Sequence, residues 1–412
     1  MLVDFTVANY RSFNQPQTFS MIADSTDELP DNLIKIHDDL FLLRSAAIYG
    51  ANASGKSNLL KAMDDFASLI VRSADSSRID RPIREYQPFL FNAAQATKPT
   101  HFEIRVVSEE TIYRYGVEFT GKKVVGEWLY QKAGKKKEQI LFERENQTFQ
   151  LGQLFKAEGS PLQDKVRENA LFLSVCAQFK GEISTKTYFS ILCHFISEIS
   201  VGKGFFRNAN AEKIHSRPEF KQSIVALLKS CDIHIADLLA EPKSEAQKKS
   251  EFLDPDKPAN NYLLVHTLHD NSGQQVGQRS LPLEEESEGT QRLFDLGLLF
   301  ESHKFFFKSF LVDELDDSLH PLLQENLVRL FHERQREPKQ LIFTTHSTEI
   351  LTNKLFRRDQ IWFTEKDELG ATELYSLLEI KGVRKDLSYG KNYLLGRFGA
   401  IPKVTPFEPS DG

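Results

Sequence analysis

Eight consecutive residues constrain this chain more than any other feature: Gly50-Ala51-Asn52-Ala53-Ser54-Gly55-Lys56-Ser57. They match the pattern GxxxxGK[ST], whose glycines let the backbone turn so that its N–H groups point at phosphate oxygens. A short apolar run (45–49) precedes the pattern, and apolar residues at helical spacing follow it. The positive N-terminal end of that helix would add to the loop amides. The sequence therefore predicts a strand, a phosphate-binding loop and a helix; an accidental glycine-rich turn is the alternative.

This loop assigns roles to its own side chains. Lys56 is placed for the β- and γ-phosphates of a nucleoside triphosphate, and Ser57 for a Mg²⁺ ion. The residues expected to contact the nucleotide here are Gly50, Asn52, Ala53, Ser54, Gly55, Lys56, Ser57 and Asn58.

A second apolar strand ends in two acids, Phe310-Leu311-Val312-Asp313-Glu314. On the same sheet as the glycine loop, Asp313 would hold the metal shell, directly or through water. Glu314, one residue further, would polarise or deprotonate the water that attacks the γ-phosphate. A solvated strand end is the alternative, since apolar strands that end in acids are common.

A third segment, Ser287-Glu288-Gly289-Thr290-Gln291, opens a predicted helix about two dozen residues before Asp313. A serine, a glycine and free amides at a helix N-terminus form a second anion-binding device. One glycine loop already serves one triphosphate, so we expect Ser287, Gly289 and Gln291 to serve the nucleotide of a neighbouring copy. A plain N-cap at Ser287 is the alternative.

The strand Leu341-Ile342-Phe343-Thr344-Thr345 ends in His346. A histidine at that edge could donate to the γ-phosphate and report its presence, so His346 is a candidate catalytic residue together with Glu314. A structural strand-end histidine is the alternative.

Composition excludes several classes of protein. The chain has 412 residues, 40% of them hydrophobic, and a net charge of −6, so no global basic field attracts nucleic acid. No stretch approaches the roughly 20 apolar residues that span a bilayer. The cysteines (Cys176, Cys193 and Cys231) are widely spaced and are expected to be buried free thiols. No signal peptide is evident, and we expect a cytoplasmic protein.

The order of elements predicts an α/β fold with a mainly parallel sheet flanked by helices. We expect an N-terminal lobe (1–155) with the glycine loop and an antiparallel β meander, a helical insertion (156–260), and a C-terminal lobe (261–412). Within the insertion, Glu241–Asn260 is expected to be a loop, and Phe220–Leu239 a helix.

Taken in order, these segments resemble the Walker A, signature, Walker B, D-loop and H-loop motifs of ABC-type ATPases, in the RecF/SMC-like branch. Asp316-Asp317-Ser318 would be the D-loop, with Asp316 near the nucleotide. Asn9-Tyr10-Arg11-Ser12-Phe13 is similar to the opening of RecF-like heads, which implies that Arg11 approaches the phosphates. Gln87 would be the Q-loop glutamine near Mg²⁺. An ordinary surface arginine and a loop glutamine beside Pro88 are the alternatives.

More narrowly, the chain resembles the AbiLi/RloA-type ATP-binding proteins of bacterial anti-phage loci. The segments that carry this resemblance are Arg44–Asn52, Asp313–Asp316 with Leu319-His320-Pro321, and Tyr393–Pro402. The chain departs from the LSGGQ signature, because Thr290 replaces the second glycine and Glu288 occupies the serine position. The resemblance implies a partner encoded nearby, often a nuclease or another toxic effector.

We therefore expect an Mg²⁺-dependent ATPase that forms a homodimer or a higher oligomer through its ATP sites and gates an effector protein. One alternative is a DNA repair or recombination ATPase that touches DNA through the basic turn at Lys135, Lys136 and Lys137. Another is an ATP-bound scaffold that turns over little and sequesters a toxic partner.

Overall fold

The computed structural model describes residues 1–75, 81–192, 196–197, 207, 210–242, 260–302, 308–333 and 338–402. Its core is a six-stranded sheet that carries the glycine loop. The strand order is β11 (Ile196–Ser197), β15 (Ser309–Val312), β16 (Gln340–Thr344), β5 (Ser45–Gly50), β17 (Ile361–Lys366) and β18 (Thr372–Ser376). All neighbours pair in parallel except β17 and β18, which form an antiparallel pair. The predicted α/β architecture is confirmed.

A second, seven-stranded antiparallel sheet confirms the predicted meander. Its order is β10 (Thr148–Leu151), β9 (Gln139–Glu145), β8 (Val124–Ala133), β7 (Thr111–Phe119), β6 (Thr100–Ser108), β1 (Leu2–Ala8) and β2 (Gln17–Ser20). Inward residues such as Phe102, Ile104 and Val106 are fully buried at every second position of β6. This alternation is what a sheet with one covered face requires. A small hairpin of β3 (Leu33–His37) and β4 (Leu40–Leu43) lies beside it.

Helix α1 (Lys56–Arg72) packs with both sheets, because its buried face shares one apolar cluster with Ile48 and Ile342 of the central sheet and with Phe102 of the meander. The opposite face of the central sheet, including Tyr49 and Phe343, belongs to a second cluster. That cluster contains residues of α6 (Pro218–Ser230), α8 (Glu288–Ser302), α9 (Pro321–Glu333) and α10 (Tyr389–Leu394). Because successive residues of a strand face opposite sides of the sheet, α1 and α8 pack on opposite faces of it.

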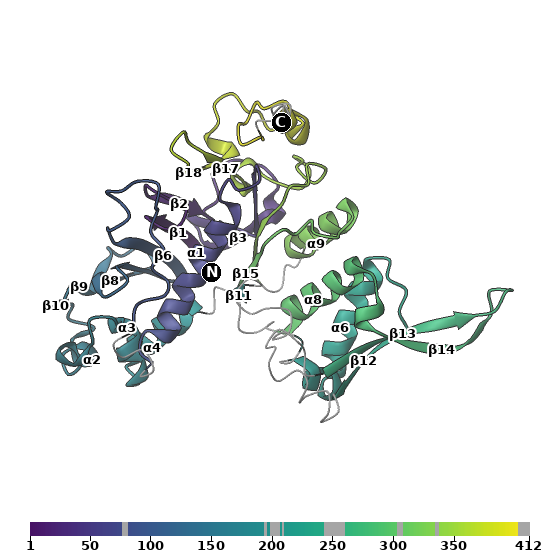
Figure 1. Cartoon of the computed structure of the whole chain (residues 1–412), viewed down its shortest axis with the longest axis horizontal. Coiled ribbons are helices and arrows are strands. Elements are labelled where there is room, and N and C mark those ends of the chain that lie inside the picture. The colour runs from purple at the N-terminus through teal and green to yellow at the C-terminus, as the bar shows by residue number, and fades with distance from the viewer. Residues whose placement is uncertain are drawn as a thin grey trace, which may run out of the picture.

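The expected helical insertion (156–260) is helical only in part. Its described helices are α2 (Lys156–Gly159), α3 (Phe172–Gln178), α4 (Glu182–Leu192) and α6. Residues of α3 and α4 join the α1 side of the molecule, whereas α6 packs on the α8 side (Figure 1). The predicted helix Phe220–Leu239 is wrong after Ser230, because Leu238 and Ala240 alternate with half-buried neighbours in strand β12 (Asp237–Pro242). Most of the expected loop Glu241–Asn260 lies outside the described residues.

Strands β12, β13 (Asn260–His269) and β14 (Gln275–Pro282) form a separate antiparallel sheet. The far ends of β13 and β14 extend away from the body of the molecule (Figure 1). Only Tyr262–Leu268 of this hairpin was expected to be a strand, since the glutamine-rich β14 has little apolar alternation. Cys176 and Cys231 are buried free thiols as expected, and Cys193 lies outside the described residues. Across the described chain, no helix is long and apolar enough to cross a membrane.

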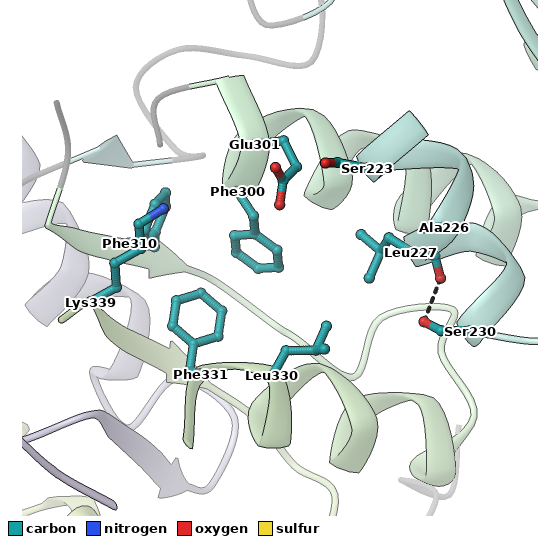
Figure 2. A pocket seen from close by; sticks show the side chains of 10 residues that line it. All are labelled: Ser223, Ala226, Leu227, Ser230, Phe300, Glu301, Phe310, Leu330, Phe331 and Lys339. Atoms are coloured by element: carbon teal, nitrogen blue, oxygen red, sulfur yellow. Dashed lines mark hydrogen bonds between the residues drawn. The ribbon is translucent and has the colours of Figure 1, made fainter. Parts of the chain in front are cut away.

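A cavity of about 270 Å³ separates α6, α8 and α9 above strand β15 (Figure 2). Its floor consists of Phe300, Phe310 and Phe331, whose rings meet edge to face with centroids 5.0–5.7 Å apart. The lining is mostly apolar and includes no residue of the glycine loop (50–57). The cavity is therefore a feature of how α8 packs and is separate from the expected phosphate site.

We expect Phe331→Ala to lower the free energy of unfolding by about 3 kcal/mol, because it removes one ring of this trio and enlarges the cavity. Chemical denaturation measures the change. Leu322→Ala on the same helix is the control, since Leu322 is 68% exposed and its loss should cost less than about 0.5 kcal/mol. Equal losses in the two variants would contradict this account of the packing.

Candidate nucleotide-binding site

The glycine loop joins β5 to α1 with backbone angles that only glycine adopts easily. Gly50 has φ +156° and Gly55 has φ +117°. A Cβ atom at Gly55 would collide with the hydroxyl of Thr372, and one at Gly50 with the carbonyl of Thr364. Both glycines are therefore required by conformation and by space. The loop ends at Lys56, the first residue of α1, so the helix N-terminus faces the loop as predicted.

Two threonines of the neighbouring strands hold the loop from below. Ser54 Oγ shares a 2.6 Å hydrogen bond with Thr364 Oγ1 of β17. Thr372 Oγ1 of β18 donates to the carbonyl of Ser54 at 2.7 Å and bonds Ser12 Oγ at 2.8 Å. Sequence reasoning missed both threonines, because their importance depends on the β5–β17–β18 strand order and no local motif marks them.

Lys56 is buried at the centre of the loop. Its ammonium donates to the carbonyls of Gly50 at 2.9 Å and Ala51 at 3.1 Å. Burial lowers the pKa of Lys56, while Asp313 and Glu314 act in the opposite direction. The loop's own carbonyl oxygens thus hold the positive charge of Lys56 at the centre of the loop.

Asp313 stands at the end of β15, directly opposite the start of α1. Its Oδ1 accepts hydrogen bonds from Ser57 Oγ at 3.1 Å and from Thr344 Oγ1 at 2.6 Å. Thr344 Oγ1 in turn accepts from the backbone N–H of Glu314 at 2.7 Å. Adjacent oxygen ligands of one octahedral Mg²⁺ lie about 3 Å apart, since each metal–oxygen bond is about 2.0–2.1 Å. The spacing between Ser57 and Asp313 therefore fits the ion.

Glu314 adopts a left-handed backbone conformation with φ +51°, which turns the chain sharply after the strand. The residue is exposed, and within the described part of the chain no group donates a hydrogen bond to its carboxylate. An exposed carboxylate without a hydrogen-bond donor can orient a water molecule or accept a proton from that water.

His346 and Asp316 lie on the same side of the loop as Glu314. The N–H of His346 donates to Asp316 Oδ2 at 3.0 Å, and Asp316 Oδ1 is buried without a partner among the described residues. Burial lowers the pKa of His346, and the positive charge of Lys56 lowers it further. The imidazole is therefore neutral at physiological pH and retains one N–H to donate.

Arg11 and Gln87 meet each other beside α1. Arg11 Nε donates to Gln87 Oε1 at 2.9 Å, and Arg11 Nη1 donates to Asn58 Oδ1 at 3.3 Å. Gln87 Nε2 donates to Asp65 at 3.0 Å, so its amide is occupied at both ends and does not bond Ser57 or Asp313. Arg11 thus contacts Asn58, which follows Ser57 in the sequence. The expected contacts of Arg11 with phosphate and of Gln87 with Mg²⁺ stay predictions.

The signature segment lies on the other side of the central sheet from α1. Ser287 Oγ accepts from the N–H of Thr290 at 3.2 Å, which is an N-cap bond. Gly289 packs on the backbone carbonyl of Ser318, which belongs to the segment expected to be the D-loop. Gln291 Nε2 donates to the carbonyl of Glu286 at 3.0 Å. Ser287 is exposed, and its hydroxyl bonds only the backbone N–H and the hydroxyl of Thr290 among the described residues. The structure therefore does not bring Ser287, Gly289 or Gln291 to Lys56 of the same chain.

Arg292 links this segment to the acidic strand end. Its guanidinium donates to the carbonyls of Asp313 at 3.0 Å and Glu314 at 3.3 Å. Sequence reasoning missed Arg292, although its place directly after Gln291 is a usable signal. The expected basic turn is a hairpin tip between β8 and β9, where Lys135 pairs with Asp39 at 2.8 Å.

A glycine loop on a parallel strand, a buried lysine, and a Ser–Asp pair at the adjacent strand end define a P-loop ATPase. The chain belongs to the family described as "AAA domain, putative AbiEii toxin, Type IV TA system", whose model matches residues 45–352. This range extends from β5 through His346. The expected P-loop ATPase family is thereby confirmed.

Comparison with curated proteins gives no match. Among solved structures, an SMC head bound to the C-terminal winged-helix domain of ScpA is 13% identical, with a TM-score of 0.42, over 91% of this chain and 97% of the other. The SMC head domain from Thermotoga maritima is 14% identical, with a TM-score of 0.42, over 91% and 98%. An SMC head from Pyrococcus furiosus, bound to the C-terminal domain of ScpA, is 13% identical with a TM-score of 0.39, over 91% and 96%.

We expect the imidazole of His346 to titrate at a higher pH in Lys56→Met than in the unsubstituted protein. The reason is that a nearby cation disfavours the imidazolium, and removal of that cation makes protonation easier. NMR titration of the nucleotide-free protein measures the midpoint. Lys61→Met, on the same helix, is the control and should leave the midpoint in place; an unmoved midpoint in Lys56→Met would place His346 away from the loop.

Proposed function

We propose that this protein binds ATP with Mg²⁺ and hydrolyses it to ADP and phosphate between two copies of the chain. The observation that carries the proposal is the division of the phosphate-binding groups. The glycine loop and Lys56 form one half on the α1 side of the sheet, whereas the exposed Ser287 end of α8 lies on the other side. A second copy can supply its Ser287 end to the loop, which gives two equivalent sites across a two-fold axis.

The loop side of the site binds the triphosphate. Lys56 exchanges the carbonyls of Gly50 and Ala51 for β- and γ-phosphate oxygens, and the loop amides at Asn52 through Gly55 with the N-terminus of α1 hold the remaining charge. Arg11 reaches the same region through Asn58. Lys56 changes its hydrogen-bond partners without leaving the loop, which keeps the reorganisation on binding small.

Ser57 and Asp313 would hold Mg²⁺, which supplies charge neutralisation for the phosphate oxygens. Thr344 fixes the Asp313 carboxylate, and the same hydroxyl fixes the backbone of Glu314. Glu314 is then free to orient the attacking water and take its proton. His346, neutral and with an N–H to donate, hydrogen-bonds the γ-phosphate and distinguishes ATP from ADP.

We further propose that ATP-dependent dimerisation is a switch that gates a toxic partner, with a nuclease as the leading candidate, in a cytoplasmic anti-phage system. The family's description, which names a toxin of a type IV toxin–antitoxin system, supports this context. The Gly289–Ser318 contact and the Arg292 bond to Glu314 support the switch, since they join the surface offered to the second copy to the site of hydrolysis.

Glu314→Gln tests the hydrolysis step. We expect ATP turnover to fall by about 10²- to 10⁴-fold, because the amide cannot accept the proton, while ATP binding is kept. Gel filtration with ATP and Mg²⁺ should then show a persistent dimer. Asp317→Asn serves as a control for the loss of a nearby negative charge. Unchanged turnover in Glu314→Gln would remove Glu314 from this role.

Mixing two inactive variants tests the composite site. Lys56→Ala removes the loop side and Ser287→Arg blocks the partner side, so each alone should hydrolyse almost no ATP. An equal mixture forms mixed dimers with one intact site, and we expect activity to return to at most about a quarter of the original, the value for two sites that work independently. If the mixture stays inactive although mixed dimers are detected by mass spectrometry, the sites are not shared between copies.

A further inference from the structure

The hairpin of β13 and β14 is longer than the sheet that supports it. Strand β12 pairs with Asn260–Val265 only, so His266–His269 have β14 as their sole neighbour among the described strands. Figure 1 shows this part of the hairpin standing clear of the remaining body. A two-stranded ribbon exposed on both faces is marginally stable in water, and a third strand would stabilise it.

Strand β14 is an edge of this sheet, and its pairing reveals which backbone groups point outward. Pro282 pairs with Leu263, and because proline has no N–H this pair must be of the non-hydrogen-bonded kind. Alternation along the ladder then places Ser280 and Gln278 in non-hydrogen-bonded pairs as well. Their N–H and C=O groups point away from β13, and no described residue hydrogen-bonds them.

Natural edge strands are usually blunted by lysines, prolines, bulges or a covering segment. Strand β14 contains no lysine; its one charged residue is Arg279, and its one proline, Pro282, stands at its last position. The ladder with β13 is irregular only at the tip, next to His269. Val276 is 62% exposed and Leu268 is 41% exposed. We propose that the outer edge of β14 accepts an extended segment of a partner protein as an added strand.

The positive charge of Arg279 on β14 indicates which charge the added segment should carry. In the added pair Gln278 and Ser280 would exchange hydrogen bonds, and Arg279 between them would stand directly opposite a partner side chain at the closest cross-strand distance. Two copies of β14 could also pair with each other, with Gln278 of one copy opposite Ser280 of the other. In that register the two Arg279 side chains would stand opposite one another. That arrangement is repulsive, so the occupant is a different polypeptide, with Asp or Glu opposite Arg279.

The base of the hairpin is tied to the signature segment. His266 Nε2 and Glu286 Oε1 lie 2.7 Å apart, and Glu286 directly precedes Ser287. The carbonyl of Glu286 also accepts from Gln291. A strand bound to β14 would therefore bias the position of the Ser287 helix end. This coupling rests on the proposed function, whereas strand addition itself does not.

A fluorescein-labelled peptide, Thr-Val-Thr-Glu-Thr-Val-Thr, is the probe for strand addition to the full chain. We expect saturable binding by fluorescence anisotropy, weakened about tenfold or more by Gln278→Pro or Ser280→Pro, because each proline removes an outward N–H that the peptide would use. Gln278→Ala keeps the backbone donor and is the matched control. The peptide with Lys in place of Glu should bind more weakly, and Arg279→Glu should reverse that preference.

Hydrogen exchange of the same complex gives a second readout. Residues 275–282 should exchange more slowly with peptide bound, while β12 should not change. The proposal would be overturned if the peptide did not bind, or if it bound equally well to Gln278→Pro and Ser280→Pro. Slower exchange in β12 alone would also overturn it. Self-association without nucleotide that is lost in Ser280→Pro would identify a second copy as the occupant and would also overturn it. Binding with unchanged ATP turnover would leave the added strand intact and contradict only the coupling.

Discussion

The site depends on one constraint: the loop between Gly50 and Lys56 must keep a conformation that the free chain would not adopt. Two glycines with positive φ make this turn sterically accessible, but they also give the unfolded chain additional freedom, which opposes order. The hydroxyls of Thr364 and Thr372 offset that freedom by holding Ser54 from two neighbouring strands. The loop is therefore stable only when residues more than 300 positions apart in the sequence are assembled into one sheet.

The same long-range assembly explains Asp313. Its carboxylate lies opposite Ser57 because β15 and β5 both pair with β16, which places their carboxyl ends at one edge of the sheet. Thr344 stands at the end of the intervening strand and bonds both Asp313 and the backbone of Glu314. A substitution at Thr344 would thus disturb the metal side and the water side of the site together, although neither the expected Walker A nor Walker B pattern includes it.

Sequence patterns predicted the parts whose chemistry is local. The glycine loop, the acidic strand end and the strand ending in His346 are each defined within a few residues, and the structure brings them to one place. Residues whose role arises from strand order, such as Thr364, Thr372 and Thr344, carry no such pattern and were missed. The middle of the chain was predicted less well, because the apolar spacing of 220–239 suits a helix while tertiary pairing makes its end a strand, β12. The amide of Gln87 bonds Arg11 and Asp65, and its expected place beside Mg²⁺ stays a prediction.

Arg292 lies between two parts of a shared site, the acidic end of β15 and the N-terminal end of α8. One guanidinium group bonds the carbonyls of both acidic residues and stands one helical turn from the glycine that rests on Ser318. In an assembly of two copies, each Arg292 would connect the hydrolytic centre of its own chain to the cap that its chain lends to the other. Hydrolysis at one nucleotide would then affect the cap on the other nucleotide, so turnover at the two sites would be correlated rather than independent.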